Sequence, residues 1–267
     1  MPAMNDASSI KQQYANADGL NIRMALHRKY SINKQPYGDW ILEHYHIQSG
    51  MKVLELGCGT GSMWAEPSRW LPEDASLLLT DLSEGMLETA RKNVPAQPNI
   101  AFAQVDIQQI PYEDNRFDLV IANAMLYHVP NLDRALGEVA RVLKPNGRFI
   151  CSTTGDHGMH QWFQQVLGEG ESPSLPFSLQ NGGAALEKHF AIADRRIRDD
   201  GLEVTDVEDL AAYVRSTLSF GFVREWPPEE LTARLFAQMK DGVIRIPKEY
   251  GLFIGSGPKK EIGRAHV

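Results

Sequence analysis

Short apolar runs alternate with amphipathic segments through the middle of the chain. The apolar runs predict five strands, at residues 51–56, 76–82, 99–106, 117–124 and 148–154. The amphipathic segments predict three helices among them, at residues 62–70, 83–94 and 131–144. Strands that alternate with helices are typical of βαβ units around a parallel sheet. The pattern therefore predicts an α/β fold, Rossmann-like and doubly wound, with a mostly parallel sheet.

The pattern changes on either side of this core, which we place at residues 49–154. Residues 20–48 have amphipathic periodicity and predict an N-terminal helical cap. Residues 155–190 hold clustered Gly, Pro and Ser around one short aromatic helix near Trp162. Such a segment between regular elements predicts a lid insertion after the fifth strand.

Residues 191–257 predict two further strands and two helices, which complete a seven-stranded sheet. The strands are expected at residues 193–204 and 251–256. One helix should begin after Thr205 as its N-cap, and the other at the proline pair of PPEELTARLF. No long linker interrupts the chain, so we expect a single domain over residues 1–267.

The last six residues, IGRAHV at 262–267, follow a polar stretch and show no structural period. They are also the peptide that a common sequencing adapter encodes. We therefore expect them to be non-native and exclude them from the prediction of the fold.

The composition narrows the class of protein. Of the 267 residues, 43% are hydrophobic and 23% charged, and the net charge of -7 argues against binding to nucleic acid or to an anionic membrane. The two cysteines, Cys58 and Cys151, fit a reducing compartment better than a disulfide framework. No apolar stretch approaches the ~20 residues of a membrane span, and the polar start lacks the centre of a secretory signal. We therefore expect a cytoplasmic protein.

The first predicted strand runs into a glycine-rich loop, VLELGCGTGS. Gly57, Gly59 and Gly61 have the spacing G-x-G-x-G, whereas a dinucleotide site uses G-x-G-x-x-G. Glu55, just before the loop, would repel a pyrophosphate and attract an ammonium group. Glycines let backbone N–H groups approach a ligand closely. The loop favours S-adenosylmethionine over a dinucleotide, and a tight turn without a ligand is the alternative.

Polar residues end the next three predicted strands. Asp81 ends the second strand, where a carboxylate at the switch point of a doubly wound sheet can accept from both ribose hydroxyls of a ligand. Asp106 ends the third strand and can accept from an adenine amine, and Asn123 ends the fourth strand, over the cofactor. These positions favour an adenosine-containing cofactor, with a helix-capping role as the alternative for Asp81.

With these residues, the run from Val53 to Thr154 resembles the cofactor-binding core of the class I S-adenosylmethionine-dependent methyltransferases. The resemblance is to the small-molecule branch (type 11) that includes the ubiquinone/menaquinone-biosynthesis enzymes. LELGCGTG resembles the first motif of that family, TDLSEGMLETAR the second and VDIQQIPYEDNRFDLV the third.

The resemblance implies S-adenosyl-L-methionine as the cofactor, and it implies roles for the residues of these motifs. Asp81 would bind the ribose, Met86 would pack by the adenine, and Asp106 and Ile107 would lie at the adenine. The full set of implied cofactor contacts in the core is Glu55, Gly57, Gly59, Gly61, Asp81, Leu82, Met86, Asp106, Ile107 and Asn123.

Two further comparisons with the family concern the cap and the substrate. Tyr30, in HRKYSINK, is similar in placement to the family's tyrosine over the cofactor carboxylate, which makes it a candidate contact. The fourth strand ends in N-A-M-L and departs from the N/D-P-P-Y/F of amino-directed nucleic-acid methyltransferases. We therefore expect a small-molecule substrate and no nucleic acid, while the acceptor atom and the oligomeric state stay open.

Methyl transfer is an in-line displacement at a sulfonium, whose leaving group is neutral and good. The protein supplies alignment, desolvation and, where the nucleophile holds a proton, a base. Tyr127 and His128, in MLYHVPN after the fourth strand, are the candidate catalytic residues, because histidine titrates near neutral pH. A packing role for His128 at the start of a loop is the alternative.

Other residues whose side chains could bind a metal or a substrate have simpler interpretations. His157 and His160 have no matched cysteine or acidic partner, so we expect no metal site. Trp162 and Phe163 are expected to pack within the lid, and an aromatic cage is the alternative.

The sequence leaves two classes of function. The first is an enzyme that transfers a methyl group from S-adenosylmethionine to a small molecule. The second is a methyltransferase-fold protein that binds the cofactor without catalysis and acts as a regulator or partner subunit. An NAD-dependent oxidoreductase is disfavoured by the missing third glycine of the dinucleotide motif.

Overall fold

The computed structural model describes residues 17–168 and 174–260, which form two compact units. Unit 1 comprises the described residues of three stretches, Met1–Lys34, Gly155–Leu175 and Arg198–Tyr250. Unit 2 comprises those of Gln35–Thr154, Pro176–Ile197 and Gly251–Val267.

The sequence predicted one domain with a cap, a lid and C-terminal elements. The cap, the lid and the C-terminal elements each lie partly in unit 1. The lid predicted at residues 155–190 is not confirmed, because its first residues belong to unit 1 and those from Pro176 onward to unit 2. The tail predicted to be non-native, at 262–267, lies outside the described residues.

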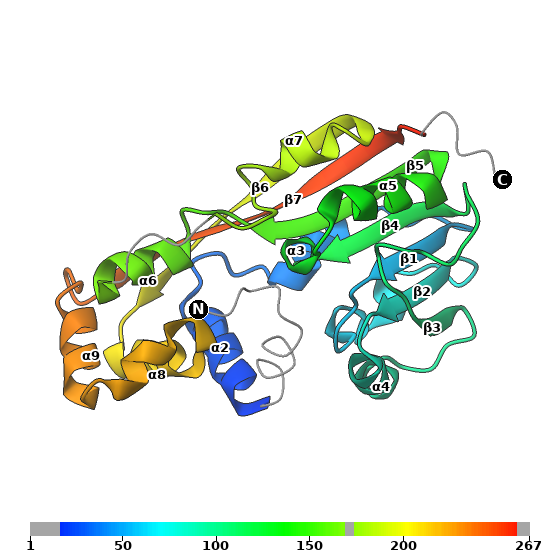
Figure 1. Ribbon diagram of the computed structural model, residues 1–267. Helices are drawn as coiled ribbons and strands as arrows, with labels where there is room; N and C mark the ends of the chain where they lie inside the picture. The colour runs from blue at the N-terminus through cyan, green and yellow to red at the C-terminus, as the bar shows by residue number, and fades with distance from the viewer. Residues whose placement is uncertain (1–16, 169–173, 261–267) are drawn as a thin grey trace. The chain divides into compact units, whose positions relative to one another are not determined.

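The described strands form a seven-stranded sheet in the order β3-β2-β1-β4-β5-β7-β6 (Figure 1). They are β1 (Lys52–Leu56), β2 (Ser76–Asp81), β3 (Ile100–Gln104), β4 (Phe117–Asn123), β5 (Leu143–Thr154), β6 (Phe190–Val204) and β7 (Ile244–Pro258). Strand β1 pairs in parallel with β2 and β4, β2 with β3, and β4 with β5. The chain therefore reverses its direction of progress across the sheet between β1 and β4. This confirms the predicted doubly wound, mostly parallel α/β fold and places its switch point.

Unit 2 contains the helices that flank these strands. They are α3 (Tyr37–Glu43), α4 (Glu84–Asn93), α5 (Leu132–Val142) and α7 (Gly182–Leu186). The predicted N-cap of α4 is confirmed, because the Ser83 hydroxyl accepts from the backbone N–H of Met86 at 3.4 Å. Asn131 caps α5 by accepting from the N–H of Arg134 at 3.0 Å.

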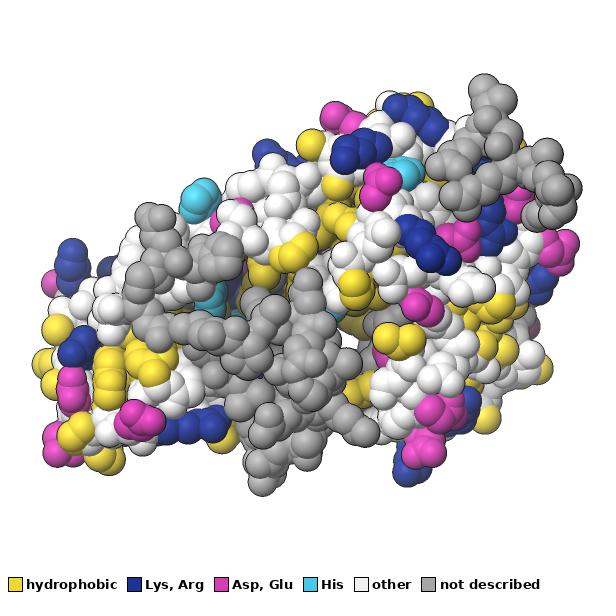
Figure 2. Space-filling view, viewed as in Figure 1, with side chains coloured by type: hydrophobic (Ala, Val, Ile, Leu, Met, Phe, Trp, Pro, Cys, Tyr) yellow, Lys and Arg dark blue, Asp and Glu magenta, His cyan; other side chains and the backbone are white. Residues whose placement is uncertain are grey.

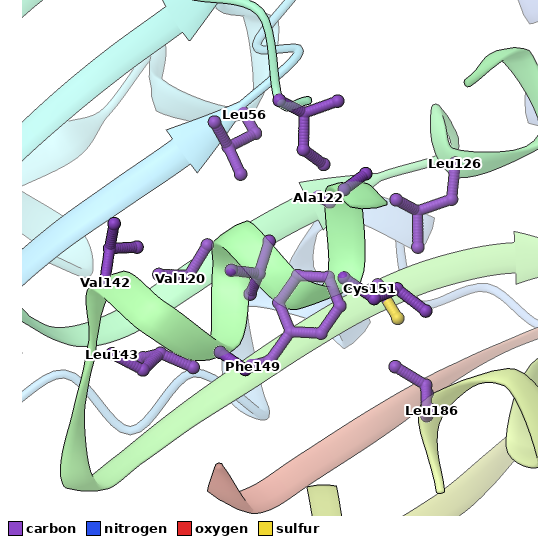
Figure 3. Packing of buried hydrophobic residues seen from close by; sticks show 14 of the residues in the cluster. Leu56, Val120, Ala122, Leu126, Val142, Leu143, Phe149, Cys151 and Leu186 are labelled. Carbon is purple, nitrogen blue, oxygen red and sulfur yellow. The ribbon is translucent and has the colours of Figure 1, made fainter. Parts of the chain in front are cut away.

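Alternate residues of β4 and β5 pack on opposite faces of the sheet. Val120 and Ala122 of β4 are in register with Phe149 and Cys151 of β5, and all four join the same buried cluster. Figure 3 shows these side chains gathered together with residues of β1, α5 and α7. Ile121 and its register partner Ile150 join a second cluster. A strand buried on both faces reads as a continuous apolar run, which explains why the sequence predicted β4 well.

Unit 1 is built from helices and from parts of β6 and β7. Its helices are α2 (Ala17–Tyr30), α6 (Met159–Leu167), α8 (Val207–Ser216), the 3-10 segment η4 (Leu218–Glu225) and α9 (Pro228–Phe236). Phe163 is buried, stacks on Tyr213 with ring centroids 5.6 Å apart, and lies 5.3 Å from the ring of Phe220. Trp162 packs edge-on against Phe163. These contacts support the packing interpretation of the aromatic helix and not the cage.

The structure corrects several predicted boundaries. Leu143 and Lys144, expected at the end of a helix, are the first residues of β5. The helix expected at 62–70 is a pair of 3-10 turns, η1 (Ser62–Trp64) and η2 (Pro67–Arg69), because Pro67 has no N–H for an α-helical bond. Helix α8 is capped by Asp206, not Thr205, since the Asp206 side chain accepts from the N–H of Glu208 at 3.0 Å. Strand β7 begins before residue 251, where polar residues between buried ones hid the strand.

The described surface carries charges of both signs. On the face shown in Figure 2, acidic and basic side chains of the described residues are interspersed, without a large patch of one sign. Within the described ranges, no helix is both long and apolar enough to cross a membrane.

Candidate functional site

The glycine loop is a tight turn at the carboxyl end of β1. Gly57, Gly59 and Gly61 have φ angles of 71°, 55° and 69°, in the left-handed region that favours glycine. A Cβ at Gly61 would lie 2.7 Å from Val94 Cγ2, so that glycine allows α4 to pack against the turn. A Cβ at Gly59 would meet nothing within 4 Å. The turn is therefore closed against the protein at Gly61 and open at Gly59, the side from which a ligand can approach.

Asp81, the last residue of β2, holds this turn in place. Its Oδ2 accepts from the backbone N–H of Gly59 at 2.9 Å, and its Oδ1 accepts from the N–H of Ser83 at 2.9 Å. The backbone N–H of Cys58 donates to the carbonyl of Thr80 at 2.8 Å, which ties the same turn to β2. The predicted proximity of Asp81 to the glycine loop is thus seen directly. A carboxylate has about four acceptor positions, so two remain for a ligand.

Glu55 is buried at the base of the turn, with an exposed fraction of 2%. Its Oε2 accepts from Trp64 Nε1 at 2.5 Å, and its Oε1 accepts from Asn123 Nδ2 at 3.1 Å. Both donors are neutral. Burial is the main cause that raises the pKa of Glu55 from 4.5 to about 7, against the two hydrogen bonds, which lower it.

Asn123, at the end of β4, connects Glu55 to two other elements. Its Nδ2 also donates to Tyr45 Oη at 2.6 Å, and its Oδ1 accepts from Ser152 Oγ, on β5, at 3.2 Å. The Asn123 amide, which was expected to lie over the cofactor, is therefore hydrogen-bonded to the protein through both its nitrogen and its oxygen. The adjacent Ala124 has a φ of 49°, a strained conformation for a residue with a Cβ. Its N–H donates to the Ser152 carbonyl at 3.0 Å, which helps to hold that conformation.

The raised pKa of Glu55 predicts how stability depends on pH. The folded chain holds this proton more tightly than the unfolded chain, so the free energy of unfolding should fall as pH rises from the unfolded pKa through the folded one. A shift from 4.5 to about 7 corresponds to a loss of roughly 3 kcal/mol between about pH 5 and about pH 8. Denaturant unfolding of the wild type and of Glu55→Gln at several pH values measures it. A wild-type slope that the variant retains would assign the pH dependence to other groups.

A second set of predicted contacts follows β2 and β3. Leu82, directly after Asp81, has 64% of its surface exposed, which is high for a leucine. Met86 lies half-buried in the first turn of α4. Asp106 accepts from the N–H of Gln108 at 2.8 Å, and the neighbouring Ile107 is buried. Leu82 therefore offers an apolar surface beside the Asp81 carboxylate.

The candidate catalytic residues follow β4 in the short 3-10 segment η3 (Leu126–His128). The rings of Tyr127 and His128 are half-buried and contact each other, with centroids 4.5 Å apart. They begin four residues after Asn123, on the same edge of the sheet as the glycine turn. Their catalytic role stays a prediction.

Tyr30 belongs to unit 1, whereas the residues above belong to unit 2. Its hydroxyl donates to Asp209 Oδ2 at 2.7 Å, within unit 1. The predicted contact between Tyr30 and the cofactor stays a prediction. Sequence reasoning missed Tyr45, Trp64 and Ser152, which carry no motif and come from three separate segments.

Solved structures with similar folds assign the class of this architecture. The YcgJ protein of Bacillus subtilis aligns with a TM-score of 0.57 at 18% identity, over 84% of this chain and 98% of that chain. Phosphoethanolamine N-methyltransferase 2 of Haemonchus contortus, solved in complex with S-adenosyl-L-methionine, aligns with a TM-score of 0.58 at 15% identity, over 94% and 60%. The [4+2]-cyclase SpnF aligns with a TM-score of 0.50 at 20% identity, over 85% and 80%. The fold is therefore that of the class I methyltransferases, which confirms the predicted fold family.

The sequence comparison assigns the family of the core. Residues 54–151 match the family described as the methyltransferase domain. Demethylmenaquinone methyltransferase of Symbiobacterium thermophilum is 37% identical over 109 residues, 40% of this chain and 43% of that protein. The ubiquinone/menaquinone biosynthesis C-methyltransferase UbiE of Haemophilus ducreyi is 37% identical over 107 residues, 39% and 41%. The chain thus aligns with about two fifths of the length of each of these relatives.

Proposed function

We propose that this protein is an S-adenosylmethionine-dependent methyltransferase that acts on a small molecule in the cytoplasm. One observation supports it above the others. The open glycine turn after β1 is joined to the carboxylate of Asp81 at the end of β2, through Gly59 N–H, within the residues that match the methyltransferase domain. The glycine turn would let the backbone approach a ligand closely, and the Asp81 carboxylate beside it would accept from the ribose. Both lie at the switch point, where doubly wound folds bind their ligands.

The residues at this edge fit the proposed cofactor. Gly59 is open where a ligand must approach, Asp81 has acceptor positions left, and exposed Leu82 offers an apolar contact for adenine. Glu55, when ionised, would favour the ammonium group, with Met86, Asp106, Ile107 and Tyr30 as further contacts. The cofactor would supply a methyl group on a sulfonium.

The protein's own contribution would be alignment and, for some acceptors, removal of a proton. Asn123, held by Tyr45, Glu55 and Ser152, would fix the end of β4 from which Tyr127 and His128 extend. His128 would take a proton from the molecule that receives the methyl group, since a neutral imidazole can bind a proton near neutral pH. The names of the two relatives make demethylated quinones the first acceptors to try.

Calorimetry with S-adenosylmethionine and the full chain tests the shared part of the proposal, and no binding would refute it. Formation of S-adenosylhomocysteine with a panel of acceptors tests catalysis. Tight cofactor binding without turnover on any acceptor would favour the alternative, a non-catalytic regulator or partner subunit. SpnF, a protein of similar fold, is named a [4+2]-cyclase, so the fold by itself does not specify methyl transfer.

The proposed base makes a specific prediction once an acceptor is known. His128→Gln should lower kcat by roughly 100-fold, the typical contribution of general base catalysis, and leave the cofactor Kd within about twofold. His46→Asn is a matched control, because His46 is exposed and its left-handed backbone (φ 44°) suits asparagine. If kcat is unchanged in His128→Gln, His128 is a packing residue.

A further inference from the structure

The connection from β3 to β4 carries the two predicted adenine contacts and has little regular structure. It spans residues 105–116, all of them described, and it holds one isolated bridge but no helix. Its polar groups therefore need partners from other elements. Arg134 Nε, on α5, donates to the carbonyl of Gln108 at 2.7 Å. The carboxylate of Glu138, one turn further along α5, accepts from the N–H of Ile110 at 2.9 Å. Helix α5 thus fixes the path of this connection.

Within the connection, Gln108 donates to the carboxylate of Asp106 from both its backbone and its side chain. The Gln108 N–H donates to Asp106 Oδ1 at 2.8 Å, while Gln108 Nε2 lies 3.2 Å from Oδ1 and 3.3 Å from Oδ2. Both residues are half-buried. Three contacts to the two oxygens restrict rotation of the carboxylate about its bond to Cβ.

The Gln108 side chain is itself anchored at the start of α5. Its Oε1 accepts from the backbone N–H of Asn131, the N-cap of that helix, at 3.2 Å. With the bond from Arg134 to its carbonyl, both the side chain and the backbone of Gln108 are joined to the first turn of α5. A side chain that is supported in this way keeps its geometry better than one on an unsupported loop. Gln108 therefore links the Asp106 carboxylate to a helix.

The same contacts make the two oxygens of Asp106 unequal. Each carboxylate oxygen has about two acceptor positions. Among the described residues, Oδ1 accepts from two donors of Gln108, the N–H and Nε2, whereas Oδ2 accepts from Nε2 alone. Oδ2 is therefore the oxygen that has a position left for a ligand.

We propose that Gln108 is a positioning residue that directs Asp106 Oδ2 at the exocyclic amine of adenine. The inference rests on the proposed function, since adenine is part of the proposed cofactor. Hypoxanthine has an oxygen in place of that amine and a donor, N1–H, next to it. A carboxylate that is free to turn would accept from either base, whereas one that is fixed in direction accepts from adenine and repels the oxygen of hypoxanthine. Gln108 thus sets the selectivity for the base through Asp106.

Calorimetry of the full chain with S-adenosylhomocysteine and with S-inosylhomocysteine, which carries hypoxanthine, tests the inference. Wild type should bind the adenine compound more tightly by about tenfold or more, as expected for one hydrogen bond to a charged group. In Gln108→Leu and in Gln108→Ala the ratio of the two Kd values should fall to about threefold or less, because Asp106 can then turn. Gln109→Leu changes the adjacent glutamine, which is exposed, and should keep the wild-type ratio.

Equal binding of the two compounds by wild type would overturn the inference, and this readout does not depend on the folding of any variant. An unchanged ratio in both Gln108 variants would overturn it too, as would loss of the ratio in Gln109→Leu. A merely structural role of Gln108 would weaken both compounds by the same factor and leave the ratio as it is in wild type. Failure of wild type to bind either compound refutes the proposed function together with this inference. Tight binding with an unchanged ratio refutes the role of Gln108 alone.

Discussion

Asp81→Ala should weaken binding of S-adenosylmethionine by about 100-fold or more. The carboxylate is expected to accept from the ribose, and hydrogen bonds to a charged group contribute roughly 1.5–3 kcal/mol each. The substitution also leaves the N–H groups of Gly59 and Ser83 without their present acceptor. Calorimetry on the purified variant measures the loss.

Two controls make this result specific. Glu88→Ala removes an exposed negative charge from α4, close in sequence, and should leave the Kd within about twofold. Asp81→Asn keeps one acceptor oxygen and should fall between wild type and Asp81→Ala. If affinity is unchanged in Asp81→Ala and circular dichroism shows an intact fold, Asp81 is not part of the cofactor site.

The glycines of the turn should separate stability from binding. Gly61→Ala places a Cβ 2.7 Å from Val94 Cγ2 and 3.1 Å from Ala90 Cβ, in a backbone with φ of 69°. Overpacking and left-handed strain together should lower the free energy of unfolding by about 2–5 kcal/mol. Gly59→Ala meets nothing within 4 Å and should cost about 1–2 kcal/mol, from backbone strain alone.

The losses of cofactor affinity should show the reverse order, with a larger loss in Gly59→Ala than in Gly61→Ala. The Cβ of Gly59→Ala would stand where the turn is open, so this variant should lose cofactor affinity by a factor of ten or more while it stays folded. Urea unfolding and calorimetry on both variants provide the comparison. Equal losses of stability in the two variants would show that the cost of Gly61→Ala does not come from a clash with α4. Wild-type affinity in Gly59→Ala would show that the ligand does not bind at this turn.

The sequence predicted the core of the fold well because that core is locally encoded. Strand β4 holds the apolar run of residues 119–122, and Ser83 caps α4 with a side chain three residues from its partner. Asp81 was placed beside the glycine turn because parallel strands end at a common edge, a rule that holds without knowledge of side chains.

The contacts that the sequence did not predict join segments far apart in the chain. Tyr45 meets Asn123 from 78 positions away, and Ser152 lies 29 positions beyond it. In unit 1 the hydroxyl of Tyr30 reaches Asp209 across 179 positions. Hydrophobic periodicity reports which face of an element is buried, but it contains no information about which distant polar group that face meets.

The hydrogen bonds of Asp81 bear on how strictly the site would discriminate between nucleosides. Strong rejection of a deoxy analogue arises when the missing hydroxyl leaves a buried acceptor stranded. Here the carboxylate already accepts from Gly59 and Ser83, so it is satisfied with or without a hydroxyl opposite. A deoxyribose analogue would forfeit only the bonds that it cannot make. Removal of one hydroxyl should therefore cost about the 1.5–3 kcal/mol of one hydrogen bond to a charged group, with no further penalty from a stranded acceptor.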